Sequence, residues 1–446
     1  MSTKRTDGPH TAEGIFQSLE GDILSGKYRP GDLLPSIREL ARERDVSPAT
    51  AAAAFRRLAD RGLTHVVRGV GTTVRQESLL VNSPLGAPDQ LFNGAIDVAS
   101  GAPDPAFLPD LNVHLRRISV EKTLYDVDPM LPELRTHALA QLCDVLAGRP
   151  ENVMITNGAL DGIADASEVR LRAGDRIIVE DPGFAAATSL LRSRGLALVP
   201  VPVDDEGFES VPFQAAIRHG AAAVIYSPRA QNPRGSALSA ERAAELRAAL
   251  AAARDKGRDV FVIENDHASL VANADYHSLT VDSSSWLSIR SLSKSHGPDL
   301  RFAFAAGDEL TIERMQRRQS LNRGWISTIL QRLVVDLLSD TDVQHLVSDA
   351  SVEYGKRRAR LIEALSGFGI PAFGCSGLNV MVPVDDEASV SSTLIAGGWQ
   401  ARSGQTYRHT SRPFIRLTSA ALDYDKIDQL ARHVSQALHG TTRPHR

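Results

Sequence analysis

The chain has 446 residues, of which 42% are hydrophobic and 23% are charged, a composition ordinary for a globular protein of two or three domains. Its net charge of −4 indicates no affinity for membranes or nucleic acids when it is averaged over the chain. However, residues 1–76 carry 12 Lys and Arg against 9 Asp and Glu, which is +3 there and −7 in the remainder. This asymmetry fits a DNA-contacting head on an acidic body.

The first 76 residues predict three helices. Apolar residues at helical spacing indicate a first helix that ends near Ser25. A second helix is expected to begin at Pro35 or Ser36. Ser47 is a favourable N-cap for a third helix that extends through Arg61.

Two short strands should follow these helices. Residues 63–67 and 72–75 flank a glycine-containing turn, which predicts a β-hairpin. Three helices and a hairpin make up the winged helix-turn-helix layout. The outer face of the third helix is expected to carry small side chains, so that the helix backbone can approach the major groove closely. These residues are Ala49, Thr50, Ala51 and Ala53.

Basic side chains of this head are placed to meet DNA phosphates. They are Arg38, Arg56, Arg57 and Arg68. The glycines of the hairpin would allow close approach to the minor groove. The alternative is a small helical bundle that docks a protein.

Residues 25–63 and the "RGVGTTV" hairpin resemble the GntR family of bacterial regulators, and the resemblance covers residues 12–75. It implies DNA-contacting positions for Arg38, Ser47, Thr50, Arg68 and Gly69. The chain departs from the family at Pro48, where an arginine is usual, so a base contact is expected to be missing there.

Residues 77–95 lack periodicity and contain prolines and a glycine, which predicts a linker. Beyond it, short apolar runs alternate with alanine-rich helical stretches, a rhythm typical of an α/β domain with a mostly parallel sheet. The predicted strands are Val153–Thr156, Arg176–Val179, Leu196–Val199, Ala222–Tyr226, Val260–Glu264, Trp286–Ile289 and Phe302–Ala306.

Long helices are expected at 328–338 and 347–365, followed by a smaller α+β unit with strands near 378–382 and 414–418. The predicted domains are therefore a head at 8–76, a linker at 77–95 and a body at 96–440, with a small C-terminal subdomain at about 330–440.

One segment of the body predicts cofactor chemistry. The run Ser291-Leu292-Ser293-Lys294 is followed seven residues later by Arg301. A lysine in this setting can form a Schiff base with a phosphorylated aldehyde, while the hydroxyls and the arginine hold the phosphate. Pyridoxal phosphate (PLP) is the obvious candidate.

Other polar segments fall at the predicted carboxyl ends of strands, where open α/β sheets hold ligands. The turn 156–160 could bind phosphate through backbone amides. Residues 180–184 place an aromatic side chain after a turn, and 231–235 place an amide at a turn; alone, these predict core packing and an ordinary turn. Residues 264–267 combine carboxylates with an imidazole, but no second histidine completes a metal site. Arg416 alone would be interpreted as an ion-pair partner.

In this order the segments resemble fold-type I aminotransferases, over roughly residues 96–440. The resemblance implies that the phosphate is held by Gly158, Ala159, Leu160, Ser291, Ser293 and Arg301. It assigns the Schiff base to Lys294, ring stacking to Phe184 and the ring hydroxyl to Asn232. Arg416 would bind a substrate or effector carboxylate, and Tyr125 would reach the phosphate of a neighbouring subunit, which implies a homodimer.

The chain departs from that family at two positions that would contact the pyridine ring of PLP. The carboxylate that keeps the pyridine nitrogen protonated aligns with Asn265, and the usual tyrosine aligns with His267. Asp266 could replace the missing carboxylate if the loop shifted by one residue. A neutral amide cannot stabilise a pyridinium by charge, so we expect little or no transaminase activity.

Head and body together resemble the MocR subfamily of GntR regulators. This implies a homodimeric transcriptional regulator that binds double-stranded operator DNA and senses PLP itself or a small amine or amino-acid effector. The alternatives are an active aminotransferase with a DNA-binding head and a PLP-free repressor. Asn265 argues against the first, and Lys294, Arg301 and Asn232 argue against the second.

Targeting signals and cysteines complete the prediction. The N-terminus is polar through Gly14, and no stretch approaches the roughly 18 apolar residues of a membrane span. We therefore expect a cytoplasmic protein. Cys143 and Cys375 lack metal-ligand spacing, and we expect both to be buried in a reducing compartment.

Overall fold

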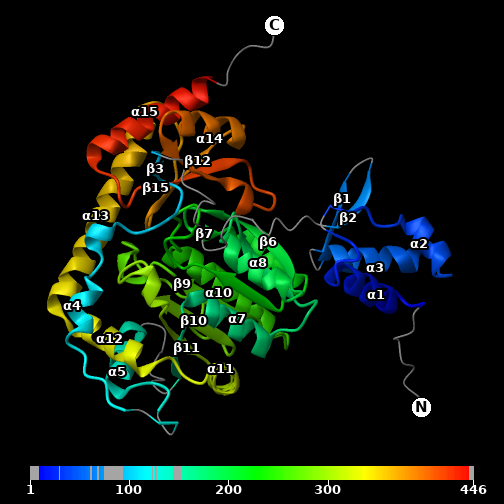
Figure 1. Ribbon diagram of the computed structural model, residues 1–446, viewed down its shortest axis with the longest axis horizontal. Helices are drawn as coiled ribbons and strands as arrows, with labels where there is room; N and C mark the ends of the chain where they lie inside the picture. The colour runs from blue at the N-terminus through cyan, green and yellow to red at the C-terminus, as the bar shows by residue number, and fades with distance from the viewer. Residues whose placement is uncertain are drawn as a thin grey trace.

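A computed structural model describes residues 10–29, 31–60, 63–67, 70–74, 94–122, 124–125, 128–143 and 152–440. The head contains the helices and the antiparallel hairpin expected of a winged helix-turn-helix (Figure 1). Its elements are α1 (Ala12–Leu24), α2 (Ile37–Glu43), α3 (Pro48–Asp60), β1 (Thr64–Val67) and β2 (Gly71–Val74). Their apolar faces bury one core, which includes Ile15, Leu19, Leu40, Phe55 and Leu58.

Local capping sets where the helices of the head begin. Ser36 and Glu39 form a reciprocal capping box at the start of α2, with Ser36 Oγ accepting from Glu39 N at 3.2 Å. Ser47 Oγ accepts from Thr50 N at 3.1 Å at the start of α3, as predicted. Ala51 is buried, so the prediction that it lies on the outer face of α3 was wrong.

The large domain is built on a mixed sheet whose eight strands, within the described residues, lie in the order β4-β11-β10-β9-β8-β5-β6-β7. The strands are β4 (Val153–Thr156), β5 (Arg176–Asp181), β6 (Ala197–Asp204), β7 (Gly207–Phe208), β8 (Ala223–Tyr226), β9 (Phe261–Asp266), β10 (Trp286–Ser291) and β11 (Ala303–Gly307). From β10 to β6 the neighbours run parallel, whereas β11 and β7 are antiparallel to theirs. The mostly parallel sheet is confirmed.

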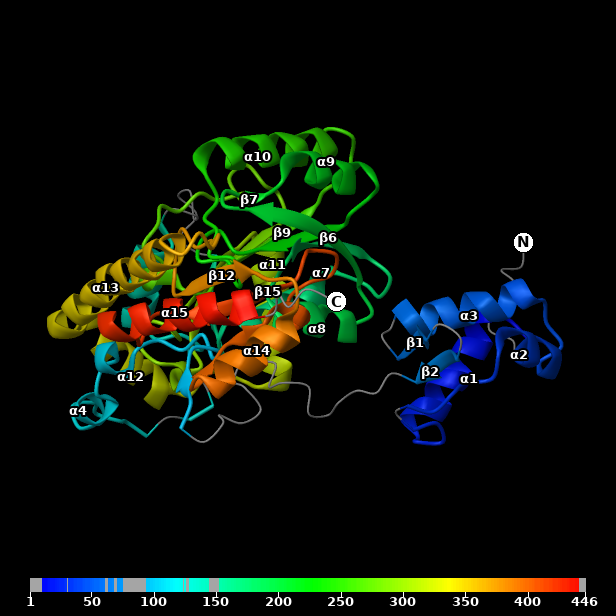
Figure 2. The ribbon, with the colours of Figure 1, turned by 90° about the horizontal axis from the view of Figure 1, so that it is seen from above.

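Helices cover both faces of this sheet (Figure 2). One face carries α7 (Ala159–Arg170), α8 (Ala185–Ser193) and α11 (Glu309–Asn322). The other carries α5 (Pro132–Gln141), α9 (Ser210–Arg218), α10 (Ala240–Arg254) and α12 (Thr328–Ser339). The short α4 (Leu111–Leu115) lies beside α12. The two faces bury separate apolar clusters, so the polar strand ends remain available at the carboxyl edge of the sheet.

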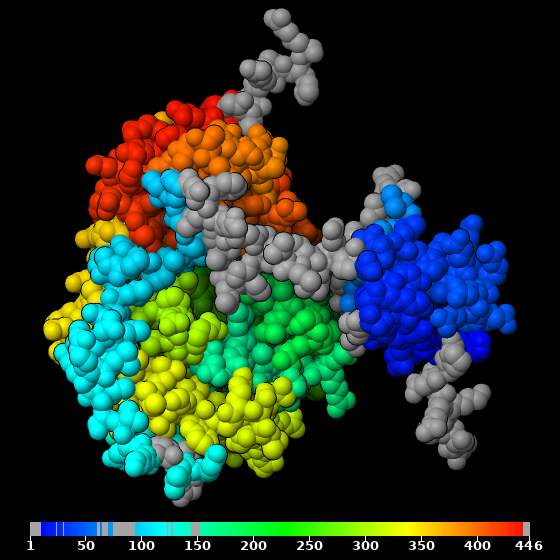
Figure 3. Space-filling model, viewed as in Figure 1, coloured from blue at the N-terminus to red at the C-terminus, as the bar shows by residue number. Residues whose placement is uncertain are grey.

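The small subdomain has a second core of its own. Its helices are α13 (Thr341–Ser366), α14 (Glu387–Ala396) and α15 (Tyr424–Gly440). Its strands are β12 (Asn379–Pro383), β14 (Arg402–Ser403) and β15 (Phe414–Thr418), paired in the order β12-β15-β14, and β13 (Trp399–Gln400). The sequence did not predict that β3 (Ile96–Asp97), from the start of the body, pairs in parallel with β13. The subdomain packs on the large domain through α13, which contacts residues 269–271, and Figure 3 shows its C-terminal part, in orange and red, above the green part of the large domain.

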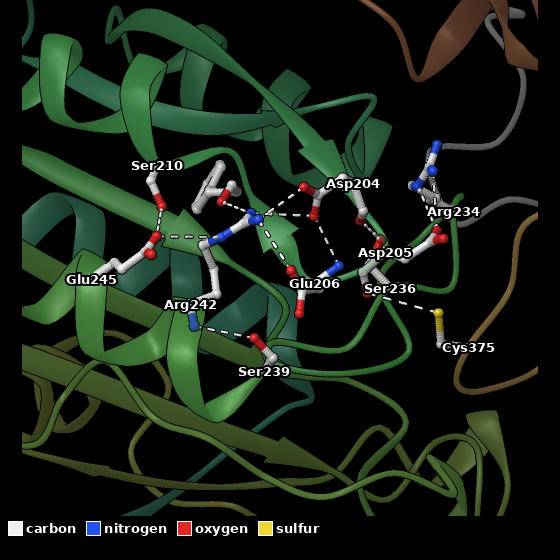
Figure 4. Close-up of polar contacts among 11 residues, drawn as sticks. Asp204, Asp205, Glu206, Ser210, Arg234, Ser236, Ser239, Arg242, Glu245 and Cys375 are labelled. Carbon is white, nitrogen blue, oxygen red and sulfur yellow. Dashed lines mark hydrogen bonds and ion pairs between the residues drawn. The ribbon is translucent and has the colours of Figure 1, made fainter.

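Ion pairs at the outer edge of the large sheet hold the β6–β7 hairpin against α10 (Figure 4). Arg242 Nη2 lies 3.0 Å from Asp204 and 3.3 Å from Glu206, and Arg234 Nη2 lies 3.0 Å from Asp205. Because these carboxylates are 39–55% exposed and screened by solvent, each pair contributes about 0–1 kcal/mol to stability.

Both cysteines are exposed, so the prediction that they are buried was wrong: Cys143 follows the end of α5, and Cys375 lies in the turn before β12. In the part of the chain that the structure describes, no helix is long and apolar enough to cross a membrane.

Candidate functional site

A cavity of about 230 Å³ opens where the carboxyl ends of the large-domain strands face the small subdomain. It brings together residues that are far apart in the sequence. They are Ser100, Gly101, Ala159, Leu160, Phe184, Asn232, Asn265, His267, Ser291, Ser293, Lys294, Pro298, Arg301, Leu378, Asn379 and Arg416.

Lys294 follows β10 and lies in the cavity wall. Its Nζ donates a hydrogen bond to the backbone oxygen of Gly101 at 2.6 Å. Burial, with a smaller contribution from the charge of Arg416, lowers the pKa of Lys294 to about 8. A substantial fraction of this amine is therefore neutral just above physiological pH, as a nucleophile that attacks a carbonyl must be.

One end of the cavity is built to hold an anion. Gly158 immediately precedes α7 and has φ of +86°, and a Cβ there would lie 3.2 Å from Arg301 Nη2. Glycine is therefore needed both for the backbone angle and for space. Arg301 Nη2 also donates to Asn157 O at 3.4 Å. The amino end of α7, a guanidinium and the hydroxyls of Ser291 and Ser293 converge here, which suits a phosphate group.

The end of β9 forms another wall, and strand alternation selects its side chains. Asn265 and His267 line the cavity. Asp266 does not: its carboxylate lies 2.9 Å from Arg229 Nη2 and 3.4 Å from Arg290 Nε. Because successive strand residues point to opposite faces, Asp266 cannot take the place of Asn265, contrary to the alternative left open by the sequence.

Asn265 and His267 are neutral groups. Asn265 is 3% exposed, and its Oδ1 has no hydrogen-bond partner among the described residues. Burial, assisted by the nearby charge of Lys294, lowers the pKa of His267 to about 4. His267 Nε2 lies 2.8 Å from Ala230 O, so the neutral ring donates through Nε2 and keeps Nδ1 as an acceptor.

Arg416 of β15 reaches the cavity from the small subdomain although it is only 1% exposed. Its Nη1 donates to Asn232 Oδ1 at 2.9 Å and to Tyr407 Oη at 2.7 Å, and its Nη2 donates to Ala99 O. The asparagine and the arginine predicted from separate motifs therefore meet. No sequence signal had pointed to Tyr407.

The turn that carries Phe184 is fixed by two buried acids. Burial raises the pKa of Glu180 to about 8, and its Oε1 accepts from Ser227 N at 3.0 Å. Asp181 accepts hydrogen bonds from the backbone and hydroxyls of Thr410 and Ser411, which outweigh burial and lower its pKa. The turn is thereby tied to the small subdomain.

Tyr125 lies outside the cavity. Its ring is 93% exposed and contacts Trp325 edge-on with centroids 6.2 Å apart. Of the cavity-lining groups that sequence reasoning missed, Ser100 and Gly101 come from the segment after β3, and Leu378 and Asn379 come from the start of β12.

The residues predicted to contact DNA lie on the surface of the head, as far as the structure describes them. Arg38, Ser47 and Arg56 are exposed, and Thr50 is half-buried. Arg57 forms an ion pair with Glu13. Arg68 and Gly69, predicted to contact DNA, lie outside the described residues.

Comparisons with known proteins agree with both halves of this architecture. Residues 11–74 match the bacterial regulatory proteins of the gntR family, and residues 123–434 match the aminotransferase class I and II family. The vitamin B6 salvage pathway transcriptional repressor PtsJ of Salmonella typhimurium is 36% identical over 431 residues, which are 96% of this chain and 98% of that protein. The HTH-type pyridoxine biosynthesis transcriptional regulator PdxR of Corynebacterium glutamicum is 29% identical over 58% of this chain and 57% of its own.

Solved structures support the fold of the body. A kynurenine aminotransferase of Pyrococcus horikoshii superposes with a TM-score of 0.70 at 19% identity, over 79% of this chain and 92% of that one. An archaeal alanine:glyoxylate aminotransferase gives a TM-score of 0.70 at 20% identity, over 78% and 91%.

A winged helix-turn-helix head joined to a body with the aminotransferase fold defines a class of transcriptional regulator, and the fold family of the body binds PLP. The chain belongs to this class: it is a member of the MocR subfamily of GntR-type regulators.

Proposed function

We propose that the body of this transcriptional regulator binds PLP through Lys294 and that occupancy of the cavity controls binding of the head to operator DNA. The observation that carries the proposal is the convergence, in one cavity, of a lysine with a lowered pKa and an anion-holding end formed by Arg301 and the start of α7.

The cavity residues fit PLP. When it is bound, PLP supplies an aldehyde that condenses with a primary amine. Lys294 would provide that amine, and Ala159, Leu160, Ser291, Ser293 and Arg301 would surround the phosphate, with Gly158 leaving the space it needs. Phe184 would lie against the ring, Asn232 and His267 would lie near its polar substituents, and the unpartnered Asn265 amide would face the ring nitrogen.

We further propose that PLP itself is the sensed compound and that the regulated genes serve vitamin B6 metabolism. Two relatives that span this architecture to different extents are named as regulators of vitamin B6 salvage and of pyridoxine biosynthesis. A small amine or amino acid is the second candidate effector, because the guanidinium of Arg416 lines the cavity and could bind a carboxylate. The absence of a charged partner at Asn265 favours sensing over transamination.

We propose that the head, at 8–76, binds double-stranded DNA through Arg38, Ser47, Thr50, Arg56, Arg68 and Gly69, and that 77–95 joins it to the body at 96–440. The protein should act in the cytoplasm as a homodimer. Tyr125, its exposed neighbour Leu124 and the contact of Tyr125 with Trp325 support a role for this surface in pairing two subunits.

Absorption spectroscopy tests the cofactor proposal directly. Titration of the purified protein with PLP should give the visible absorption of a lysine-bound cofactor, and borohydride reduction should fix the added mass on the peptide that contains Lys294. Lys294→Ala should lose both signals, whereas Lys356→Ala, a substitution on α13 away from the cavity, should keep them. A wild type without the band, or a label on another lysine, would contradict the proposal.

DNA binding is tested separately. Affinity for a duplex selected from a random pool by the wild-type protein should fall steeply with salt, because the basic side chains displace counterions. Truncation after Gln76 should abolish the binding of the body to this duplex and leave its PLP uptake intact. Specific binding by the headless body would refute this division of labour.

A further inference from the structure

Residues 96–101, called the strap below, form the first described stretch of the body that enters the ligand cavity. Its end contacts two of the basic side chains of that cavity, Lys294 and Arg416. Lys294 Nζ donates to Gly101 O at 2.6 Å, and Arg416 Nη2 donates to Ala99 O. The carbonyl groups of Ala99 and Gly101 therefore accept from the guanidinium and the amine, respectively.

The other end of the strap belongs to the small subdomain. Ile96 and Asp97 pair with β13, and Val98 is fully buried in the core of the subdomain. Thr418 completes the attachment from β15: its backbone N donates to Val98 O at 2.8 Å, and its Oγ1 accepts from Gly101 N at 3.1 Å.

The fit of Gly101 leaves little freedom. Its φ is +70°, and a Cβ at this position would lie 3.2 Å from Arg416 Nη2. Asp97 Oδ1 accepts from Ala99 N at 2.8 Å and from Ser100 N at 3.0 Å, which fixes the bend that precedes it. The strap is thus held at every step by hydrogen bonds, and its final bonds depend on the state of Lys294 and Arg416.

We propose that the strap is the part of the body through which occupancy of the cavity reaches the DNA-binding head: consumption of the Lys294 amine releases Gly101 and so loosens the end of the strap that enters the cavity. This inference rests on the proposed function, since it requires an aldehyde-bearing ligand at Lys294. It assigns a signalling role to backbone groups that line the same cavity.

The chemistry of Lys294 would weaken its contact with Gly101. If the amine condensed with an aldehyde, a carbon–nitrogen double bond would form, and the carbonyl oxygen would leave as water with two hydrogens of the ammonium form. The nitrogen would then carry at most one hydrogen instead of three. Gly101 O and any acceptor on the ligand would compete for that single hydrogen.

A ligand carboxylate would act on the adjacent contact. Arg416 Nη2 donates to Ala99 O, and a carboxylate is a stronger acceptor than a peptide carbonyl. A carboxylate-bearing ligand would therefore compete with Ala99 O for Arg416. An aldehyde without a carboxylate, such as PLP itself, would displace the bond to Gly101 alone.

Hydrogen exchange on the full-length, ligand-free protein tests whether these contacts hold the strap. Lys294→Met removes the donor to Gly101, and Thr418→Val removes the acceptor of Gly101 N while preserving side-chain size. Each should speed exchange of the amides of residues 98–101 about fivefold, the effect of losing one hydrogen bond. Ser419→Ala, which removes the neighbouring hydroxyl bonded to Leu378 O, is the matched control and should leave the strap unchanged.

The second arm measures affinity for the selected duplex with and without PLP. In the wild type PLP should change this affinity, and Lys294→Met without PLP should resemble the PLP-loaded wild type. Thr418→Val should still take up PLP, but the ratio of its two affinities should fall toward one; Ser419→Ala should keep the wild-type ratio.

Unchanged exchange in Lys294→Met, or a full response to PLP in Thr418→Val, would overturn the role of the strap while leaving cofactor binding intact. A wild type that takes up no PLP would instead refute the proposed function. In that case the exchange measurement would still decide whether Lys294 holds the strap.

Discussion

Replacement of Glu180 by glutamine should stabilise the body at alkaline pH. Glu180 is the next-to-last residue of β5, before the turn that carries Phe184; it is 7% exposed and accepts a hydrogen bond from Ser227 N at 3.0 Å. Burial raises the pKa of Glu180 from 4.5 to about 8, although the hydrogen bonds from Ser227 and Gln231 oppose this change. Folding therefore favours the protonated acid.

The sign and size of the effect follow from this pKa. Stability contributed by the protonated acid is complete below pH 4.5 and is lost as the pH rises to about 8. Each pH unit in that window corresponds to about 1.4 kcal/mol, so the wild type should lose about 5 kcal/mol across it through this group. Glutamine keeps the acceptor for Ser227 N and cannot ionise, so Glu180→Gln should lose none of that amount.

Urea unfolding of the ligand-free protein at about pH 5, 7 and 8.5 measures the difference. Glu180→Gln should match the wild type at the lowest pH and exceed it increasingly above. Glu241→Gln, at an exposed position of α10, is the matched control and should follow the wild type throughout. Parallel stability curves for Glu180→Gln and the wild type, or a less stable variant at about pH 8.5, would refute the assignment of a buried neutral acid.

Three further predictions follow from the site. The wild type should convert bound PLP to pyridoxamine phosphate with amino acids far more slowly than the roughly 1–1000 turnovers per second of typical enzymes. Asn265→Asp should accelerate this conversion, which is measured by absorption spectroscopy; rapid wild-type conversion or an unchanged rate in the variant would contradict the assigned role of Asn265. Asp181→Ala should lower the free energy of unfolding by about 2–4 kcal/mol, because the amides and hydroxyls of Thr410 and Ser411 lose a charged acceptor. Since the pKa of Asp181 is lowered, the difference in unfolding free energy between wild type and variant should shrink as the pH falls through the acid range; a difference that is constant with pH would contradict this role of Asp181. The rate of PLP uptake should rise between about pH 7 and 9, because with a pKa of about 8 only about a tenth of the Lys294 amine is neutral at pH 7; a flat profile in stopped-flow absorbance would exclude this amine as the limiting group.

Local signals in the sequence determined most of the secondary structure and the linear motifs. β4 and β15 occupy the predicted residues, and Ser36 and Ser47 cap α2 and α3 as expected. Such features depend on near neighbours in the chain: apolar periodicity, a capping hydroxyl, or a glycine before a helix. For the same reason the run ending at Lys294 could be interpreted without knowledge of the fold.

Tertiary structure alone decided which groups meet and which face they present. A shift of one residue along β9 exchanges the cavity face for the opposite face, so only the pairing of the strand could place Asn265 inside and Asp266 on its arginines. Gly101 and Tyr407 approach Lys294 and Arg416 through a backbone carbonyl and a loop hydroxyl, which carry no sequence pattern. Gly101 reaches the cavity because β3 pairs with β13 across some 300 residues of chain, and pairing over that distance is set by the packing of the whole body rather than by any local preference.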